Sequence, residues 1–241
     1  MSYTIRTLLT GIPVTSNRGA LGWSSVILIK DSEHTLLFDT GSYGDRSLLL
    51  QALESQGLST DDIDAVAVSH FHFDHMVNLE LFQKQKVFLH HLEFDYIDRR
   101  DFHEAQDPYV PQAHIASALE RMTQVEDLEF LSPGIQVVHL PGHTPGTMGL
   151  YLQAADILLA SDAVKNAADF LQQRPPACFY SSNQALESYA RIRSFTNHII
   201  PGHDREFLLR PDGRIDYLEQ STVHFEIHDN PNQPGRCLTV F

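Results

Sequence analysis

The amino-acid sequence predicts a layered α/β domain. Short β-rich runs alternate with stretches whose apolar residues recur at helical spacing, and the alternation occurs in two similar halves of the chain. No fixed-period repeat, low-complexity tract or long Gly/Ser/Pro linker interrupts this pattern. A chain of 241 residues is compatible with one domain. We therefore expect a single domain over residues 1–241.

The first half contains predicted strands and one clear helix. The runs 24–30 and 35–40 are separated by a polar turn at 31–34, which is typical of a hairpin. Residues 45–56 have apolar side chains at helical spacing and end before Gly57, a residue that commonly terminates helices. Two further runs are expected to be strands, and these are 3–11 and the buried run 65–69.

The second half repeats the alternation of strands and helices. A Pro/Gly-rich loop separates two predicted strand pairs, whereas the segment 99–113 has no clear period. The elements that we expect are strands at 86–90 and 197–200, helices at 91–97, 115–122 and 184–195, and strand pairs at 128–140 and 148–160.

Composition excludes several classes of function. The formal net charge of −14 opposes binding to nucleic acids, which draws on Lys and Arg contacts to phosphate. No apolar segment is long enough to span a membrane, and the N-terminal residues do not resemble a secretory signal, so we expect a cytoplasmic location. Cys178 and Cys237 fit no metal-binding spacing and are interpreted as packing residues. The 14 histidines, by contrast, are many for this length.

Histidines and an aspartate gather in the segment His70-Phe71-His72-Phe73-Asp74-His75, directly after an apolar run. Zinc binds imidazole nitrogen and carboxylate oxygen, and the end of a strand can turn alternate residues toward different sides. Two neighbouring metals could therefore be bound. A surface histidine cluster is the alternative, but polar clusters rarely lie between apolar runs.

This segment resembles the HxHxDH signature of the metallo-β-lactamase superfamily. Further matches occur in the same order as in that family, and several ordered matches are more specific than any single one. They are LLFDTG at 36–41 with Asp39, LPGHTPGTMGL at 140–150 with His143, LLASDAV at 158–164 with Asp162, and IIPGHD at 199–204 with His203.

The resemblance implies a four-layer αββα metallo-β-lactamase sandwich with its site at one edge of two sheets. It also implies two divalent metal ions. Zinc is the expected metal, and iron and manganese can bind the same ligands. Asp39 would support the ligands from behind, or would alternatively cap a turn. In the implied ligand set, His70, His72 and His143 hold one ion, Asp74, His75 and His203 hold the other, and Asp162 bridges both.

Other candidate residues are assigned to packing or surface by default. Nine histidines, including His90 and His114, match no ligand motif, although His114 could line the pocket. The aromatic residues Tyr96, Phe102 and Phe179 could shape an acyl pocket, but the default interpretation places them in the core.

The expected activity is hydrolysis of a small-molecule substrate. Two metal ions can share a hydroxide that attacks an ester-like acyl carbon, and Asp74 could shuttle the proton. The segment after His203 is too short for a glyoxalase II-type substrate domain, so the layout is most similar to that of N-acyl homoserine lactonases. Those lactonases have a tyrosine three positions after the bridging aspartate, where this chain has Lys165. Lys165 is therefore either a catalytic oxyanion donor or a solvated loop residue.

Three alternatives to a lactonase stay open at this point. A thioesterase or another acyl hydrolase would use the same ligands and the same hydroxide. Members of the family that contain iron perform redox chemistry, and members that lose ligands act as non-catalytic modules. The sequence does not indicate the oligomeric state.

Overall fold

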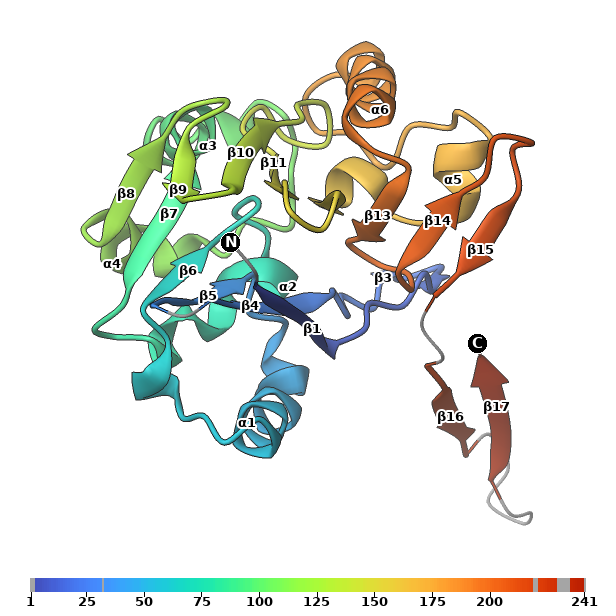
Figure 1. Cartoon of the computed structure of the whole chain (residues 1–241), viewed down its shortest axis with the longest axis horizontal. Coiled ribbons are helices and arrows are strands. Elements are labelled where there is room, and N and C mark those ends of the chain that lie inside the picture. The colour runs from blue at the N-terminus through green and yellow to red at the C-terminus, as the bar shows by residue number, and fades with distance from the viewer. Residues whose placement is uncertain (1–2, 32, 219–220, 229–234, 241) are drawn as a thin grey trace.

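Two β-sheets form the centre of the molecule. The computed structural model describes residues 3–31, 33–218, 221–228 and 235–240. One sheet has six strands in the order β1-β4-β5-β6-β7-β8, and the other has seven in the order β15-β14-β13-β12-β11-β10-β9 (Figure 1). The first sheet consists of β1 (Thr4–Leu9), β4 (Val26–Lys30), β5 (Thr35–Phe38), β6 (Ala65–Ala67), β7 (Lys86–His90) and β8 (Met122–Val125). The second consists of β9 (Phe130–Ser132), β10 (Ile135–His139), β11 (Met148–Leu152), β12 (Ile157–Ser161), β13 (His198–Pro201), β14 (Phe207–Leu209) and β15 (Ile215–Tyr217).

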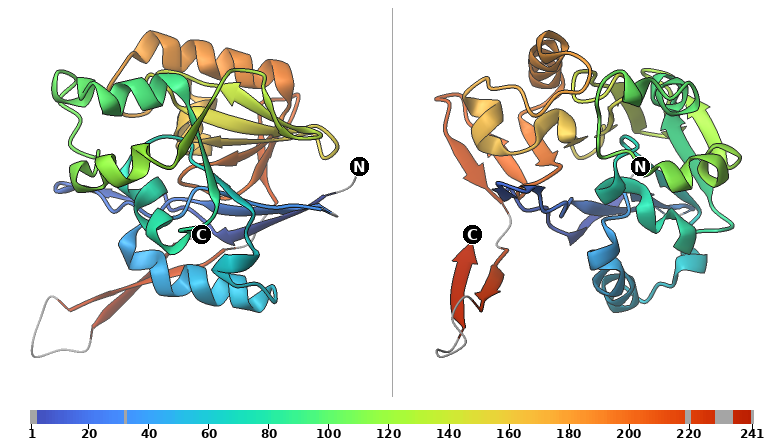
Figure 2. Two further views of the ribbon diagram at one scale, coloured as in Figure 1. Left: turned by 90° about the vertical axis from the view of Figure 1, so that its left-hand side faces the viewer. Right: turned by 180° about the vertical axis from the view of Figure 1, so that it is seen from behind.

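Helices cover the outer faces of both sheets. The left view of Figure 2 shows α1 on one side of the two sheets and α6 on the other. The α-helices are α1 (Arg46–Ser55), α2 (Phe73–Met76), α3 (His91–Asp98), α4 (Ile115–Leu119), α5 (Ala167–Leu171) and α6 (Ser182–Phe195). The 3-10 helices are η1 (Tyr43–Asp45), η2 (Thr60–Asp62), η3 (Val77–Leu81), η4 (Asp101–His103), η5 (Gln112–His114) and η6 (Asp162–Val164).

Three hydrophobic clusters fill the three interfaces between these layers. Leu49 and Leu53 of α1 pack with Val26 under the six-stranded sheet. Residues of both sheets, such as Ile27 and Leu159, pack between them. Tyr189 of α6 belongs to the third cluster, outside the seven-stranded sheet. The predicted αββα sandwich is therefore confirmed.

Strands with two buried faces explain the continuous apolar runs in the sequence. Alternate residues of a strand point to opposite faces of the sheet. Along β4, Val26 faces the helices while Ile27 faces the other sheet. Along β12, Leu158 faces the helices and Leu159 the other sheet. Such strands need apolar residues at every position, as is usual where both faces are covered.

The predicted helix at 115–122 is too long. The helix α4 ends at Leu119, and Met122 begins β8, which pairs in parallel with β7. The apolar residues of 115–122 satisfy helical spacing, but the last of them packs in the six-stranded sheet. The pairing partner Val87 lies far away in the sequence, so local periodicity could not reveal the strand.

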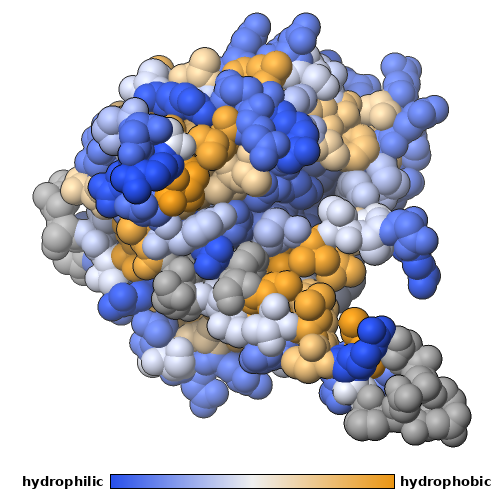
Figure 3. All heavy atoms as spheres, turned by 90° about the vertical axis from the view of Figure 1, so that its right-hand side faces the viewer, coloured by the Kyte–Doolittle hydropathy of each residue, from blue (hydrophilic) through white to orange (hydrophobic). Residues whose placement is uncertain are grey.

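Two small hairpins extend from the sandwich. The strands β2 (Thr15–Ser16) and β3 (Gly19–Ala20) form one, and β16 (Val223–Ile227) and β17 (Arg236–Val240) form the other. The second hairpin projects from the body after β15 (Figure 1). Figure 3, which looks onto this side, shows apolar side chains gathered on the body next to it. Cys237 lies exposed on β17, so its interpretation as a packing residue was wrong.

Both sheets contribute strand ends to one edge of the sandwich. The strands β5 and β6 run in parallel in the first sheet, and β12 and β13 run in parallel in the second. Carboxyl ends of parallel strands gather functional groups at one edge of a sheet. Asp39, His70, Asp162 and His203 follow these four strands in chain order. Among the described residues, no helix is long and apolar enough to cross a membrane.

Candidate metal centre

Side chains with metal-binding atoms converge at this edge. Three groups of ligand atoms, each with all its members within 4.8 Å of one another, occur among the described residues. All seven residues expected as ligands belong to at least one group, and all are buried. The groups are His70-His72-His143, His70-His75-Asp162 and Asp74-His75-His203.

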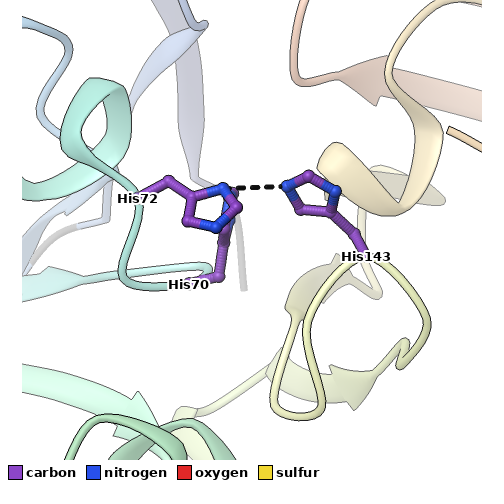
Figure 4. Close-up of side chains that lie close together, drawn as sticks. All are labelled: His70, His72 and His143. Carbon is purple, nitrogen blue, oxygen red and sulfur yellow. Dashed lines mark hydrogen bonds between the residues drawn. The ribbon is translucent and has the colours of Figure 1, made fainter. Parts of the chain in front are cut away.

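The first group contains only imidazoles. His70 Nε2 and His143 Nε2 each lie 3.0 Å from His72 Nδ1. Figure 4 shows the rings of His72 and His143 pointing toward each other from different loops. His72 uses Nδ1 here because its Nε2 lies 2.8 Å from the Asp107 carboxylate. Three nitrogen atoms thus face a common point.

The group Asp74-His75-His203, called the second group from here on, combines imidazoles with a carboxylate, and the group His70-His75-Asp162 connects it to the first. His203 Nε2 lies 3.4 Å from Asp74 Oδ2, and His75 Nε2 lies 3.9 Å from Asp74 Oδ1. The short helix α2 carries both Asp74 and His75, whereas His72 precedes it with extended backbone. This change from extended to helical backbone brings Asp74 and His75 beside His203, while the ring of His75 stays 4.2 Å from that of His70.

Asp162 lies between the two groups. Its Oδ1 is 3.4 Å from His75 Nε2 and 3.1 Å from His203 Nε2. Its Oδ2 is 3.4 Å from His143 Nε2 and accepts a hydrogen bond of 2.9 Å from Lys165 Nζ. One oxygen of this carboxylate therefore faces each group.

Unpartnered buried atoms indicate that the site fits cations. His75 Nε2, His203 Nε2 and Asp162 Oδ1 are buried and have no hydrogen-bond partner among the described residues. Buried polar atoms are almost always satisfied, so three unsatisfied atoms pointing at one space require an additional partner. Imidazole nitrogens and a carboxylate oxygen are the donors that zinc and related divalent ions prefer.

The two groups differ in their electrostatics. Burial, reinforced by the neighbouring imidazoles of His75 and His72, holds the pKa of His70 well below its usual value. Burial lowers the pKa of His143 to about 3. Burial opposes the charged form of His75 as well, but the carboxylates of Asp39, Asp74 and Asp162 prevail and raise its pKa well above normal. The first group is thus a neutral donor set and the second an acidic one.

Asp39 is buried behind the second group. Its Oδ2 lies 2.8 Å from His75 Nδ1, while its Oδ1 accepts a hydrogen bond of 2.7 Å from the Ser69 backbone N–H. The Ser69 hydroxyl donates to Asp39 Oδ2 and lies 2.9 Å from His70 Nδ1. The carboxylate therefore fixes the ring of His75 directly and that of His70 through Ser69.

The other imidazoles are fixed by groups that carry no sequence signal. The Nδ1 of His143 donates to the carbonyl oxygen of Ala177, and that of His203 lies 2.9 Å from the Trp23 carbonyl oxygen. Asp107, which holds His72, also accepts a hydrogen bond of 3.1 Å from Tyr96. Such outer partners orient ligands and raise their basicity.

Glu93 joins two loops that carry histidines of the first group. Its Oε1 accepts from the Phe71 backbone N–H at 2.9 Å, and its Oε2 accepts from Thr144 Oγ1 at 2.6 Å and from Gly146 N at 3.1 Å. The side chain is fully buried, and burial raises its pKa. Its position in α3 offered no sequence signal, because a glutamate in a helix is usually on the surface.

A pocket of about 420 Å³ adjoins the centre. Its lining includes His203 and Lys165 on the metal side, Tyr109 and Arg174 on the walls, and the β2–β3 hairpin. Lys165 is partly buried and its Nζ lies 2.9 Å from Asp162 Oδ2, so it is held at the site by an ion pair, and its role as an oxyanion donor stays a prediction. His114 is absent from this lining; its Nε2 lies 2.8 Å from the Tyr43 hydroxyl instead.

Aromatic rings cover the outer side of the first group. The ring of Phe179 lies 5.5 Å from His72 and 5.8 Å from His143, so this residue belongs to the site rather than to the core. Tyr109 lies 5.6 Å from Phe179 and its backbone N–H donates to Asp107 Oδ1 at 3.0 Å. By contrast, Tyr96 and Phe102 are buried in the core cluster, as predicted.

Comparison with known proteins gives a consistent result. Residues 21–203 match the model of the Metallo-beta-lactamase superfamily. A Methanocaldococcus jannaschii protein named "Probable metallo-hydrolase" is 25% identical over 169 residues, 70% of either chain. The N-acyl homoserine lactonase AiiB of Agrobacterium fabrum is 27% identical over 227 residues, covering 76% of this chain and 79% of AiiB. The solved structure of AidC, described as a dizinc quorum-quenching lactonase, shares the fold with a TM-score of 0.67 at 19% identity, covering 82% of this chain and 79% of AidC.

Proposed function

The chain belongs to the metallo-beta-lactamase superfamily, and from this premise we propose that it is a binuclear metal-dependent hydrolase of ester-like bonds, with lactones as its best substrates. That it is a metallo-hydrolase follows from the family and from its relatives. The number of ions, the role of each residue and the substrate are the parts that we propose.

The metal-binding residues are assigned by the groups in which they lie. One divalent ion, for which zinc is the expected metal, would be held by His70, His72 and His143. The other would be held by Asp74, His75 and His203. Asp162 would bridge them, because each of its oxygens faces one group. When bound, such a pair supplies a water nucleophile at neutral pH and Lewis acidity toward the scissile carbonyl.

The observation that carries this proposal is the convergence of buried, unpartnered ligand atoms at the wall of a pocket. His203 contributes one of these atoms and also lines the pocket. A substrate that enters the pocket therefore meets the ligands directly. A histidine cluster with a merely structural role would be satisfied by protein partners and would not open onto a cavity.

Two side chains of this chain would handle protons and charge. Asp74 lies 3.4 Å from His203, and its carboxylate can take the proton of the attacking water and pass it to the leaving oxygen. Lys165 presents its ammonium beside Asp162 in the pocket lining, where it can stabilise the negative charge that develops on the substrate oxygen.

The preference for lactones rests on the charge, the pocket and the relatives. The net charge of −14 opposes polyanionic substrates such as phosphodiesters of nucleic acids. The pocket is of a size that suits small molecules. AiiB is an N-acyl homoserine lactonase by name, and it covers most of this chain. We expect lactones to be hydrolysed faster than thioesters, and both faster than phosphodiesters.

The first experiment measures metal content and substrate preference on the same preparation. Elemental analysis is expected to give close to two transition-metal ions per chain after reconstitution. The metal-loaded protein is then assayed with acyl lactones, aryl esters, acyl thioesters, phosphodiesters and a β-lactam. At most one bound ion, with zinc, iron and manganese all tried, contradicts the binuclear centre. Turnover of phosphodiesters with inert lactones contradicts the substrate ranking.

Substitution Asp74→Asn separates proton transfer from metal binding. We expect kcat to fall on the order of 100-fold or more while KM changes little, because general acid–base catalysis contributes about 10²–10⁴-fold. Metal content is measured on the same sample. Equal losses of metal and rate would make Asp74 only a ligand.

A further inference from the structure

A carboxylate close to the first group is buried without an ion pair. Glu93, in the first turn of α3, is fully buried. Its side chain makes hydrogen bonds but no ion pair among the described residues. Burial raises the pKa of Glu93, and its hydrogen bonds and the imidazole of His72 oppose this rise. An ionised carboxylate in such a place is unfavourable unless hydrogen bonds or positive charge compensate it.

Every hydrogen-bond partner of this carboxylate is a donor. The Phe71 backbone N–H donates to Oε1 at 2.9 Å. The Thr144 hydroxyl and the Gly146 backbone N–H donate to Oε2 at 2.6 and 3.1 Å. An ionised carboxylate only accepts hydrogen bonds, whereas a carboxylic acid also needs an acceptor for its proton. The arrangement therefore suits the ionised form of Glu93.

The partners of Glu93 belong to the two loops that supply the first group. Phe71 lies between the two histidines of one loop, and Thr144 directly follows His143 in the other. Gly146 packs closely against the start of α3, since a Cβ added to it would lie 2.0 Å from the backbone nitrogen of Glu93. One side chain thus ties both loops to the same turn of the helix.

The imidazoles of the first group bring no negative charge. Burial keeps the pKa of His70 and that of His143 low, so both rings are neutral near neutral pH. Apart from the shared Asp162, the charge that compensates a cation there must come from carboxylates outside the ligand set. Electrostatic attraction is strong in the low dielectric of a buried site. Glu93 contacts both loops and can supply this charge.

We propose that Glu93 is a positioning residue of the first group, and that its negative charge favours a cation bound there. It would hold the two loops through Phe71 and Thr144 and thereby maintain the approach of His143 Nε2 to His72 Nδ1, which is 3.0 Å. This role rests on the proposed metal centre, but it needs only the ion of the first group, and neither the second ion nor any substrate.

Substitution Glu93→Gln removes the charge and keeps the size of the side chain. We expect the ion of the first group to bind on the order of 10- to 100-fold more weakly, the usual loss when a partner behind metal ligands is removed. The ion of the second group should bind as in wild type. Chelator competition with Zn²⁺ measures both affinities. Cadmium NMR of the cadmium-loaded protein identifies the weakened ion, because nitrogen and oxygen ligands give different chemical shifts.

Two further variants separate charge from geometry. Glu93→Asp keeps the charge on a shorter side chain, and Thr144→Val removes one hydrogen bond while the carboxylate stays. Both should weaken the first ion less than Glu93→Gln does, because the charge is retained. The matched control is Glu187→Gln on the exposed face of α6, which should change neither affinity.

The melting temperature of the metal-free protein distinguishes this role from a purely structural one. A folded Glu93→Gln variant with both affinities unchanged would overturn the proposal. So would a lower melting temperature with unchanged affinities, or equal weakening of both ions. If Glu93→Gln does not fold, Glu93→Asp and Thr144→Val decide, since selective weakening of the first ion is expected in each.

The proposed function and the role of Glu93 can fail separately. A wild-type protein that binds a single ion contradicts the binuclear centre. The role of Glu93 is then tested on that ion, whose loss of affinity in Glu93→Gln supports it and whose unchanged affinity overturns it. A wild-type protein that binds no ion would overturn both.

Discussion

The two ligand groups of the centre are built from different chemistry. His70, His72 and His143 form a set of neutral imidazoles, and the pKa values of His70 and His143 are lowered. The second group contains the carboxylate of Asp74 and an imidazole whose pKa is raised by acidic neighbours. An ion in the first group would thus be held by uncharged donors from two loops, and one in the second by a carboxylate together with two imidazoles.

This difference predicts different roles for the two ligand groups. A cation with neutral ligands keeps more of its own charge and polarises a nearby oxygen more strongly, whereas anionic ligands compensate the charge and favour occupancy. Asp162 is shared, with one oxygen toward each group. Substitutions that act on one group, on the other or on both can therefore test whether the two groups function as distinct sites.

The largest effect is expected from Asp162→Ala, because it removes the one carboxylate that faces both groups. Metal content should fall at both sites, and kcat should fall on the order of a thousand-fold or more, corresponding to several kcal/mol of lost stabilisation. Elemental analysis and kinetics measure these quantities. Asp212→Ala, at an exposed position paired only with Arg214, is the control. Loss of exactly one ion would place Asp162 outside the bridge.

Lys165→Met acts on the first group's side of the bridge. The ammonium contacts Asp162 Oδ2, the oxygen nearest His143. If Lys165 stabilises developing charge, kcat should fall by about 10²–10³-fold with two ions still bound. Lys165→Arg should restore part of the rate. A variant that loses an ion but keeps its rate per bound metal pair would make Lys165 a structural partner of Asp162.

Asp107→Asn and Asp39→Asn form a matched pair. Asp107 holds His72 of the first group, and Asp39 holds His75 of the second. Loss of such outer partners typically costs about 10- to 100-fold in metal affinity or activity. Competition with a chelator should reveal one weakened ion in Asp107→Asn. In Asp39→Asn the ion at His75 should weaken more than the ion at His70, which Asp39 contacts only through Ser69. Equal weakening of both ions in Asp107→Asn would show that the groups are not independent, and circular dichroism checks that both variants fold.

The smallest effect concerns two stacked imidazoles that belong to neither ligand group, those of His90 and His139. His90 is buried, stacks on His139 at 4.1 Å between ring centroids, and has an Nε2 atom with no hydrogen-bond partner in the described part of the chain. Burial, together with the neighbouring His139, lowers its pKa to about 3. Between that value and about 6.5 the unfolded chain binds a proton that the folded chain does not, so stability decreases as the pH falls below about 6.5.

His90→Phe tests this linkage. Between pH 7.5 and 5.5 the wild type should lose about 1.4 kcal/mol more stability than the variant, which has no group to titrate at this position. Urea unfolding of both proteins at the two pH values gives the difference. An equal loss in both proteins would mean that His90 does not remain neutral in the folded state.

The sequence predicted the fold well where local pattern and tertiary packing agree. The strand at 86–90 and the helix that follows it are observed at the same positions, because the change of period occurs where the sheet ends. The prediction failed for 115–122, where Met122 leaves the helix to pair with Val87. The described part of the C-terminal hairpin was also missed, because its pairing lies outside both sheets.

Prediction of the site from the sequence is limited in the same way, because local pattern does not reveal contacts between distant segments. The residues predicted to bind metal lie in motifs whose order could be compared with a known family, and the structure brings them together. Asp107 and Glu93 are isolated carboxylates whose partners come from distant loops, and Phe179 reaches the site through a turn. Only folding reveals such neighbours. Sequence therefore predicts the ligand atoms better than the groups that orient them.

The fluorescence of Trp23 can report on this centre. This residue is the only tryptophan in the sequence, so its fluorescence has a single origin. Its carbonyl oxygen contacts His203, while its indole ring stacks on Phe225 of the projecting hairpin at 5.5 Å. Indole emission depends on its surroundings, so metal uptake at His203 and movement of the hairpin can both be followed in unlabelled protein, with Phe225→Leu separating the two signals.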